Sequence, residues 1–161
     1  MQLRSFGTQI FDASNGLADE WDLISEIRSN IFCDEGRIDK SVEFDEFDES
    51  SRHVLGLSGD MPVAVARWRI FRSSHCFAII DRFATSANHR NLGYGREMLK
   101  NILHDIKEIN SLMGLDASGV FILAPVDSWV ITKLNLYGFR VIDSEIIARG
   151  GYSFSKLFKE I

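Results

Sequence analysis

A short polar turn, His89-Arg90-Asn91-Leu92-Gly93-Tyr94-Gly95-Arg96, separates an apolar run that ends near Thr85 from a segment with helical periodicity. Behind the turn, apolar residues recur at three- and four-residue spacing: Met98, Leu99, Ile102, Leu103, Ile106 and Ile109. This spacing predicts a helix that begins at about Gly93. The two glycines permit the dihedral angles of a tight turn and let a bulky ligand approach the backbone closely. The feature therefore predicts a strand, a tight turn and a long helix in succession.

The first turn of this helix is predicted to bind an anion. The leading amide groups of a helix have no acceptor inside the helix, and the aligned peptide dipoles place partial positive charge there. A diphosphate fits such a helix end. Arg90 and Arg96 add positive charge on either side of the turn, in a chain whose net charge is -5. The alternative is a glycine-containing turn that binds no ligand.

Length and charge exclude several classes of function. A chain of 161 residues is long enough for a core of its own, and we expect a single domain over residues 1–161. The net charge of -5 argues against general nucleic-acid binding, which needs a surplus of Lys and Arg. No apolar run approaches the roughly 18 residues of a membrane span, so we expect a cytoplasmic protein without a membrane partner. The two cysteines and four scattered histidines predict neither a disulfide framework nor a metal site.

Hydrophobic patterns along the chain predict a mixed α+β fold. Apolar or alternating stretches predict strands at residues 2–11, 53–57, 62–71, 76–85, 120–124, 139–142 and 152–158. Helical spacing predicts a helix over residues 17–32, the long helix behind the glycine turn, and a shorter helix that Asp127 caps.

Residues 34–49 form an acidic segment, in which eight carboxylates face only Arg37 and Lys40. Such a run is usually a solvated loop. Four apolar residues interrupt it: Ile38, Val42, Phe44 and Phe47. These residues favour the alternative of a segment anchored on the protein body, whose carboxylates face a pocket and attract a cationic amine.

The spacing Arg90-x-x-Gly93-x-Gly95, after a strand and before a helix, resembles the acyl-CoA diphosphate loop of the GNAT superfamily of N-acetyltransferases. It differs from a dinucleotide fingerprint, which needs Gly-x-Gly-x-x-Gly, and from a Walker loop, which needs Gly-Lys-Ser/Thr. The predicted order of strands and helices is also similar to the GNAT arrangement over nearly the whole chain.

The N-terminal half resembles the ElaA-like subgroup of this superfamily. Arg28, Phe32 and Glu35 match a helix end of the form Arg-x-x-x-Phe that a glutamate follows. Residues 45–53 are similar to an acidic run that leads to a histidine, and residues 62–67 are similar to a Pro-Val-Ala-x-Ala-Arg strand.

The resemblance implies a GNAT fold, with about four helices around a mostly antiparallel, twisted sheet of about six or seven strands. It also implies a splayed strand pair at the cofactor site, acetyl-CoA as cosubstrate and the amine of a small molecule or peptide as acceptor. The implied cofactor-binding residues are Phe83, Ala84, Thr85, Arg90, Asn91, Leu92, Gly93, Tyr94, Gly95 and Arg96. The oligomeric state is left open, although domains of this family often form homodimers.

Acetyl transfer to an amine needs a base, because only the unprotonated amine attacks a thioester. The resemblance implies a carboxylate on the strand before the glycine turn, and Asp81 is the first candidate. Its alternative role is a salt bridge with Arg82 or Arg67. Glu35 and Asp45 are the other candidate bases.

The acceptor site and the leaving group involve further residues. We expect Arg28, Asp45 and Arg67 to contact the acceptor. Leu134 stands where many members of the superfamily have a tyrosine that protonates the leaving thiolate, and Tyr137 is the candidate replacement.

Two other functions stay open. The first is transfer of a longer acyl chain, because the acyl-homoserine-lactone synthases share this architecture. The second is a non-catalytic acyl-CoA sensor, which Leu134 in place of the tyrosine keeps open.

Overall fold

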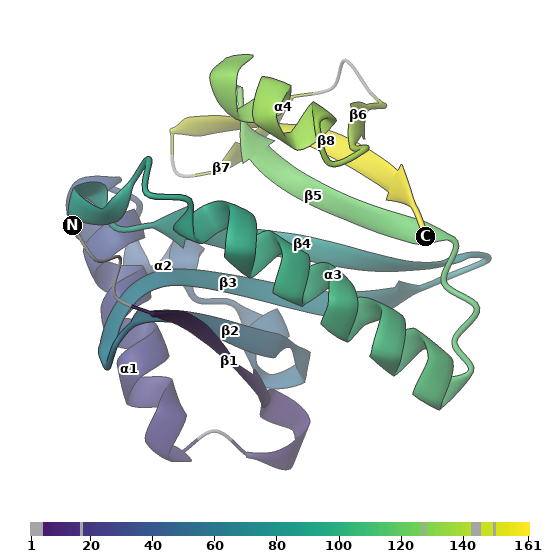
Figure 1. Ribbon diagram of the computed structural model, residues 1–161, viewed down its shortest axis with the longest axis horizontal. Coiled ribbons are helices and arrows are strands. Elements are labelled where there is room, and N and C mark those ends of the chain that lie inside the picture. The colour runs from purple at the N-terminus through teal and green to yellow at the C-terminus, as the bar shows by residue number, and fades with distance from the viewer. Residues whose placement is uncertain (1–4, 17, 127, 143–145, 150) are drawn as a thin grey trace.

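The computed structural model describes residues 5–16, 18–126, 128–142, 146–149 and 151–161. Within this part of the chain the strands form one sheet in the order β1-β2-β3-β4-β5-β8-β6, and β7 pairs with β8 (Figure 1). The strands are β1 (Phe6–Asp12), β2 (Arg52–Ser58), β3 (Met61–Arg72), β4 (Cys76–Thr85), β5 (Gly119–Pro125), β6 (Arg140–Val141), β7 (Ile147–Arg149) and β8 (Tyr152–Glu160). All pairs are antiparallel except the parallel pair β4 and β5. The predicted α+β fold is confirmed, and β7 is the strand that the hydrophobic pattern does not predict.

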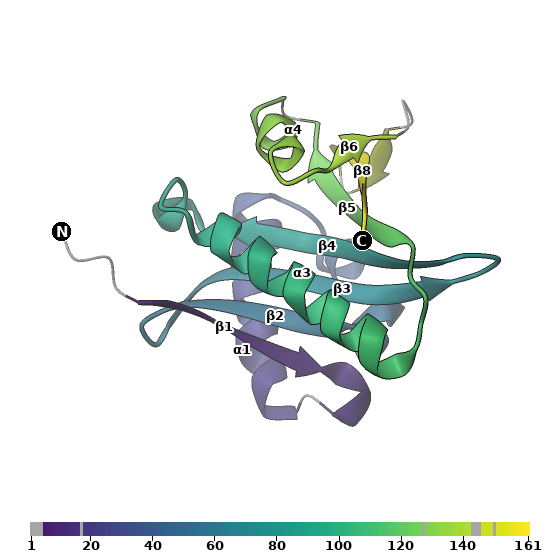
Figure 2. The same ribbon diagram turned by 45° about the vertical axis from the view of Figure 1, so that its right-hand side comes forward.

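Helices cover both faces of the sheet. Helix α3 (Tyr94–Met113) crosses one face of β1 to β4, and α1 (Ala18–Arg28) lies against the opposite face (Figures 1 and 2). A π-helical segment, Ser29–Glu35, continues α1, and the acidic segment holds the short α2 (Lys40–Glu43) and a 3-10 helix, Glu46–Ser50. Helix α4 (Ser128–Asn135) follows β5, while its predicted cap, Asp127, lies outside the described residues. None of the described helices has both the length and the apolar character that a membrane span requires.

Alternating residues of β3 face the two layers of helices. Ala66 and Trp68 pack in one core with Met98 of α3, whereas Val65 packs in a second core with Ile24 of α1. Successive side chains of a strand point to opposite faces of a sheet. Position 67 therefore shares the α1 face with Val65, and its arginine meets the acidic segment there.

Strands β4 and β5 separate toward their C-terminal ends. Their pairing runs from Phe77 with Gly119 to Ile80 with Ile122, although β4 continues to Thr85 and β5 to Pro125. In Figure 1 the two ribbons lie side by side near the label C and move apart toward the left of the view. A bulge in β4 accompanies the separation, since two residues of β4 lie opposite one of β3 at this point. This geometry confirms the predicted splayed pair.

Candidate active site

A cavity of about 270 Å³ lies where β4 and β5 separate. Its walls come from the ends of both strands, the π-helical segment behind α1, and the hairpin of β7 and β8. Phe83 and Ala84 of β4 face Leu123 and Pro125 of β5 around it. Five charged residues also line it: Glu35, Asp81, Arg82, Arg90 and Arg149. Apolar walls with a few placed charges are typical of a small-molecule site.

The glycine turn beside this cavity has a run of unpaired amides. Gly93 is the N-cap of α3 with a left-handed φ of 85°, and Asn91 has a φ of 62°. The amide of Glu97 donates to the carbonyl oxygen of Gly93 at 3.1 Å, but no described group accepts a hydrogen bond from the amides of residues 91–96. Free amides at a helix N-terminus form a concavity that suits an anion.

Tyr94 anchors the turn on the body of the protein. Its hydroxyl oxygen lies 3.1 Å from Oγ of Ser58, and its ring stacks on Phe6 with the centroids 4.9 Å apart. The side chains of Leu92 and Arg96 are exposed. The side chain of Tyr94 thus holds the turn, while the backbone amides around it stay available to a ligand.

Arg90 connects the turn with the cavity. Its Nε donates to the carbonyl oxygen of Thr85 at 3.0 Å, and its Nη2 lies 2.5 Å from Oε1 of Glu35. Both side chains are about two-fifths exposed, at 43% and 40%. Two residues predicted for different roles, cofactor binding and catalysis, therefore form one ion pair at the edge of the cavity.

Two arginines hold the carboxylate of Asp81. Arg67 donates to Oδ1 at 2.8 Å and to Oδ2 at 2.6 Å, and Arg82 donates to Oδ2 at 3.0 Å. Burial by itself would raise the pKa of Asp81, but the hydrogen bonds and charge of Arg67, with the charge of Arg82, outweigh burial and hold the pKa below its usual value. The geometry favours the salt-bridge role for Asp81, and its role as the base stays a prediction.

Asp81 is one member of a buried arginine–carboxylate network. The network comprises Arg28, Arg67, Arg82, Glu43, Asp45, Asp48 and Asp81. Arg28, which is fully buried, bonds Glu43 at 2.8 Å and Asp48 at 2.6 Å. Asp48 also accepts from Arg67 at 2.8 Å, and Asp45 accepts from both Arg67 and Arg82. The network ties the acidic segment to α1, β3 and β4.

The arginine–carboxylate network corrects the interpretation of the acidic segment. Glu43 and Asp48 are buried, so a solvated loop is wrong for these two carboxylates. The segment is anchored, as its apolar residues indicate, but its buried carboxylates neutralise arginines of the body. Arg28, Asp45 and Arg67 belong to this network, and none of the three lines the cavity. Their contact with an acceptor is untested.

We expect the free energy of unfolding to fall when the pH drops below about 4, the ordinary pKa of an aspartate. Burial alone would raise the pKa of Asp45, but Arg67 and Arg82 lower it by more, as they do for Asp81. The pKa values of Asp45 and Asp81 therefore both lie below the ordinary value. Their ionised forms therefore stabilise the fold above the unfolded-state pKa, and this stabilisation is lost as the pH falls through the lower folded-state values. Urea unfolding across this pH range measures the effect.

Asp81→Asn provides the control, because it removes one of the two carboxylates whose pKa is lowered. The variant is expected to be less stable than the parent near neutral pH, and the difference should shrink as the pH falls below about 4. A difference that stays constant over the whole range would contradict this interpretation of the network.

Tyr137 lies beyond the end of α4. Its amide donates to the carbonyl oxygen of Leu134 at 2.9 Å, and its half-buried ring packs against the core beneath α3. Tyr137 is not among the residues that line the cavity. Its role as a proton donor to the leaving group stays a prediction.

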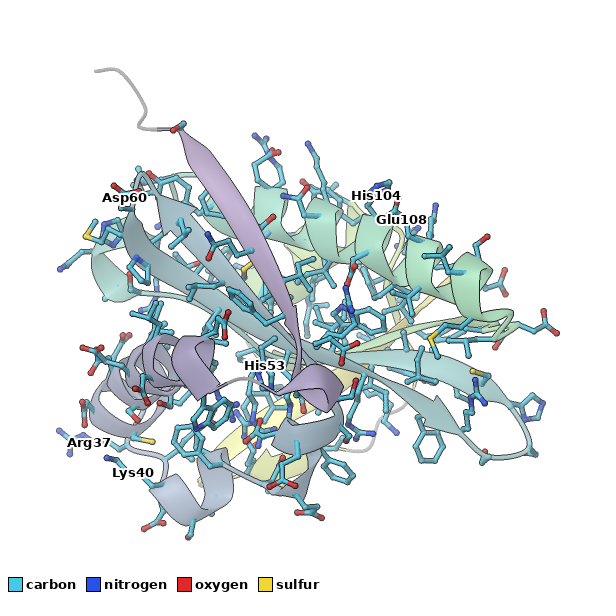
Figure 3. The ribbon with its side chains drawn as sticks, turned by 90° about the horizontal axis from the view of Figure 1, so that it is seen from below. Arg37, Lys40, His53, Asp60, His104 and Glu108 are labelled. Carbon is cyan, nitrogen blue, oxygen red and sulfur yellow. The ribbon has the colours of Figure 1, made fainter. Side chains whose placement is uncertain are left out.

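The histidines lie far apart in the structure. His53 is fully buried between the sheet and α1, with its ring 5.3 Å from that of Trp21, whereas His104 lies beside Glu108 on the outer side of α3 (Figure 3). Among the described residues there is no group of three or more potential metal ligands.

Sequence reasoning missed several charged residues around the site. The sequence predicts Arg82 only as a salt-bridge partner of its neighbour Asp81. It does not distinguish Glu43 and Asp48 from the other carboxylates of the acidic segment. Arg149 has no sequence signal, because the hydrophobic pattern does not predict β7. Their positions depend on contacts between distant parts of the chain.

Comparison with known proteins places this geometry in a family. Residues 19–117 match the Acetyltransferase (GNAT) family. The N-acetyltransferase YjcF of Bacillus subtilis (strain 168), which is itself named as uncharacterized, is 24% identical over 134 residues. These residues cover 83% of this chain and 88% of YjcF.

Solved structures agree in fold. Escherichia coli ElaA superposes with a TM-score of 0.74 at 20% identity, over 97% of this chain and 100% of that chain. A GNAT family acetyltransferase from Elizabethkingia anophelis, solved with acetyl-CoA bound, gives a TM-score of 0.63 at 17% identity, over 97% and 98% of the two chains. Because the family match spans more than half of the sequence, this chain belongs to the acetyltransferase (GNAT) family, whose members are acyltransferases that use acetyl-CoA.

Proposed function

We propose that this protein transfers an acetyl group from acetyl-CoA to the primary amine of a small molecule or peptide, within a ternary complex. The observation that carries the proposal is the separation of β4 and β5 beyond Ile80 and Ile122, with a cavity between their ends. The edge of β4 at residues 83–85 would pair with the amide groups of pantetheine. The amides of residues 91–96 would bind the diphosphate. Holding the thioester beside the amine removes the entropic cost of their encounter.

The bond changes are those of a direct acyl transfer. The amine nitrogen attacks the carbonyl carbon of the thioester, a C–N bond forms, and the C–S bond breaks. The nitrogen gives up one proton to a base, and the departing thiolate of CoA takes one proton from water. A backbone amide near Phe83, at the bulge of β4, is the proposed donor to the oxyanion.

Glu35 is the proposed base. It lines the cavity, and its Oε2 accepts no hydrogen bond from a described residue, whereas arginines hold both carboxylate oxygens of Asp81. Diphosphate arriving at the turn would compete with Glu35 for Arg90. Cofactor binding would then loosen the ion pair and leave Glu35 free to take a proton.

Glu35→Gln is expected to lower kcat by between about 10²-fold and 10⁴-fold, the usual contribution of a general base. The affinity for acetyl-CoA should not fall, because the neutral glutamine competes less strongly than glutamate with the diphosphate for Arg90. Release of free CoA thiol with a panel of amines measures turnover, and calorimetry measures binding. Glu97→Gln is the matched control, since Glu97 lies in the first turn of α3 but does not line the cavity. Turnover as fast as that of the parent would remove Glu35 from this role.

The size of the cavity favours a short acyl group over a long chain. Its volume of about 270 Å³ is just below the roughly 300–1,000 Å³ that sites for drug-sized ligands occupy. An acetyl group and a small amine fill less space than a long acyl chain with the same amine. The cytoplasmic location and the homodimer stay predictions.

A further inference from the structure

Arg149 brings a guanidinium group to the wall of the cavity between β4 and β5. It ends β7, its side chain is 16% exposed, and it lines the cavity. Two aromatic rings flank it, with the guanidinium carbon 5.0 Å from the centroid of Phe154 and 5.6 Å from that of Phe32. The rings limit the positions that the side chain can adopt.

The guanidinium of Arg149 is poorly satisfied by its neighbours. Its Nη2 lies 3.7 Å from Oε2 of Glu43, beyond hydrogen-bond distance. Its Nε is buried and has no hydrogen-bond partner among the described residues. Burial, and then the charge of Arg82, lower the pKa of Arg149, and the charges of Glu43 and Asp81 offset this lowering only in part.

The other two arginines of the cavity wall have carboxylate partners. Arg82 bonds Asp81 at 3.0 Å and Asp45 at 2.9 Å, and Arg90 is paired with Glu35. Among the described residues, the nearest carboxylate oxygen to Arg149 is Oε2 of Glu43 at 3.7 Å, whereas Oε1 of Glu43 pairs with Arg28 at 2.8 Å. Within the described part of the chain, Arg149 is therefore the arginine of the cavity wall that pairs with a carboxylate only at long range and donates no hydrogen bond. A buried charge that is only partly compensated is costly unless a ligand completes its pairing.

We propose that the amine acceptor carries a carboxylate group and that Arg149 binds this carboxylate. This inference rests on the proposed acetyl transfer and narrows its substrate class to amino acids and similar compounds. A planar guanidinium donates two parallel hydrogen bonds to the two oxygens of a carboxylate. A primary amide has one oxygen and no negative charge, so it binds a guanidinium more weakly. The carboxylate of Glu35 in the same cavity complements the amino group of such a substrate.

The test compares amino acids with their amides. Each common amino acid and its matched primary amide is offered with acetyl-CoA, and thiol release gives kcat and KM. The parent enzyme is expected to use at least one amino acid with a kcat/KM about 100-fold above that of its amide. In Arg149→Met this preference should disappear through a higher KM for the amino acid, with the KM for acetyl-CoA unchanged.

Two further variants separate recognition from damage to the fold. Arg149→Lys keeps the charge without the planar fork, so it should restore part of the preference. Arg140→Met changes an exposed arginine of β6, whose Nη1 donates to backbone carbonyl oxygens, and should leave the preference intact. Circular dichroism and thermal unfolding report whether each variant is folded.

Binding distinguishes the failure of this inference from the failure of the proposed function. Amino acids and amides are titrated into the protein saturated with CoA, and heat or a shift in Tm reports binding. Amino-acid binding that Arg149→Met abolishes, without turnover in the parent, would support the carboxylate site and overturn acetyl transfer. Turnover of amides as fast as of amino acids would overturn the carboxylate site alone. The carboxylate site would also be overturned if no amino acid binds and none is turned over.

Discussion

Gly93→Val is expected to weaken the binding of acetyl-CoA by roughly 100-fold or more, as the loss of two charge-assisted hydrogen bonds would. The residue has a φ of 85°, where a β-branched side chain is strained, so valine shifts the backbone of the turn. The shift misaligns the free amides of residues 91–96, and the added methyl groups occupy space beside the diphosphate. Calorimetric titration with acetyl-CoA measures the loss.

The fold should survive this substitution. A Cβ at Gly93 would meet only the flexible end of Arg96, at 3.7 Å. Gly114→Val is the matched control, because Gly114 caps the other end of α3 with a φ of 57° and has open space around it. Both variants place a β-branched residue at a positive φ, but the control should bind acetyl-CoA as the parent does. Equal affinity in the two variants would remove the turn from cofactor binding.

Arg67→Met is expected to destabilise the protein by about 3–5 kcal/mol, the usual cost of leaving buried charges without their partner. Arg67 is 1% exposed and bonds three carboxylates, those of Asp45, Asp48 and Asp81. Methionine fills a similar volume but donates no hydrogen bond. The carboxylates are then left close together with one arginine fewer, and their repulsion adds to the loss.

Urea unfolding measures this effect against Arg96→Met. Arg96 pairs with Glu97 at 3.1 Å, but the two side chains are 59% and 41% exposed. Exposed pairs contribute about 0–1 kcal/mol, so the control should unfold close to the parent. A loss of similar size in both variants would mean that the arginine–carboxylate network contributes little to stability.

The separation of β4 and β5 shows what a local hydrophobic pattern can and cannot predict. The apolar run at residues 76–85 predicts a strand, but which strands lie beside it, and where their pairing stops, depends on the whole sheet. The resemblance to a known family supplied this expectation, and the register of β4 with β5 confirmed it. Hydrophobic spacing alone carries no information on where two neighbouring strands diverge.

The acidic segment shows a second limit of prediction from local pattern. Its composition predicts solvation, and its four apolar residues favour anchoring, but neither identifies the charges that are buried. Glu43 and Asp48 are buried because Arg28 and Arg67 reach them from α1 and β3. The pairing partners lie 15 to 20 residues apart in the chain, so no local spacing relates them.

The sequence by itself determined the strand before the glycine turn, the turn and the helix that follows it, because each depends on the chemistry of residues close in the chain. Only the tertiary structure decided which carboxylates neutralise arginines and which groups line the cavity. Glu35, Asp81 and Arg149 come from three separate elements and meet only when the sheet and its helices pack. Ion pairs form between groups that packing brings within a few ångströms, and that proximity is a property of the fold.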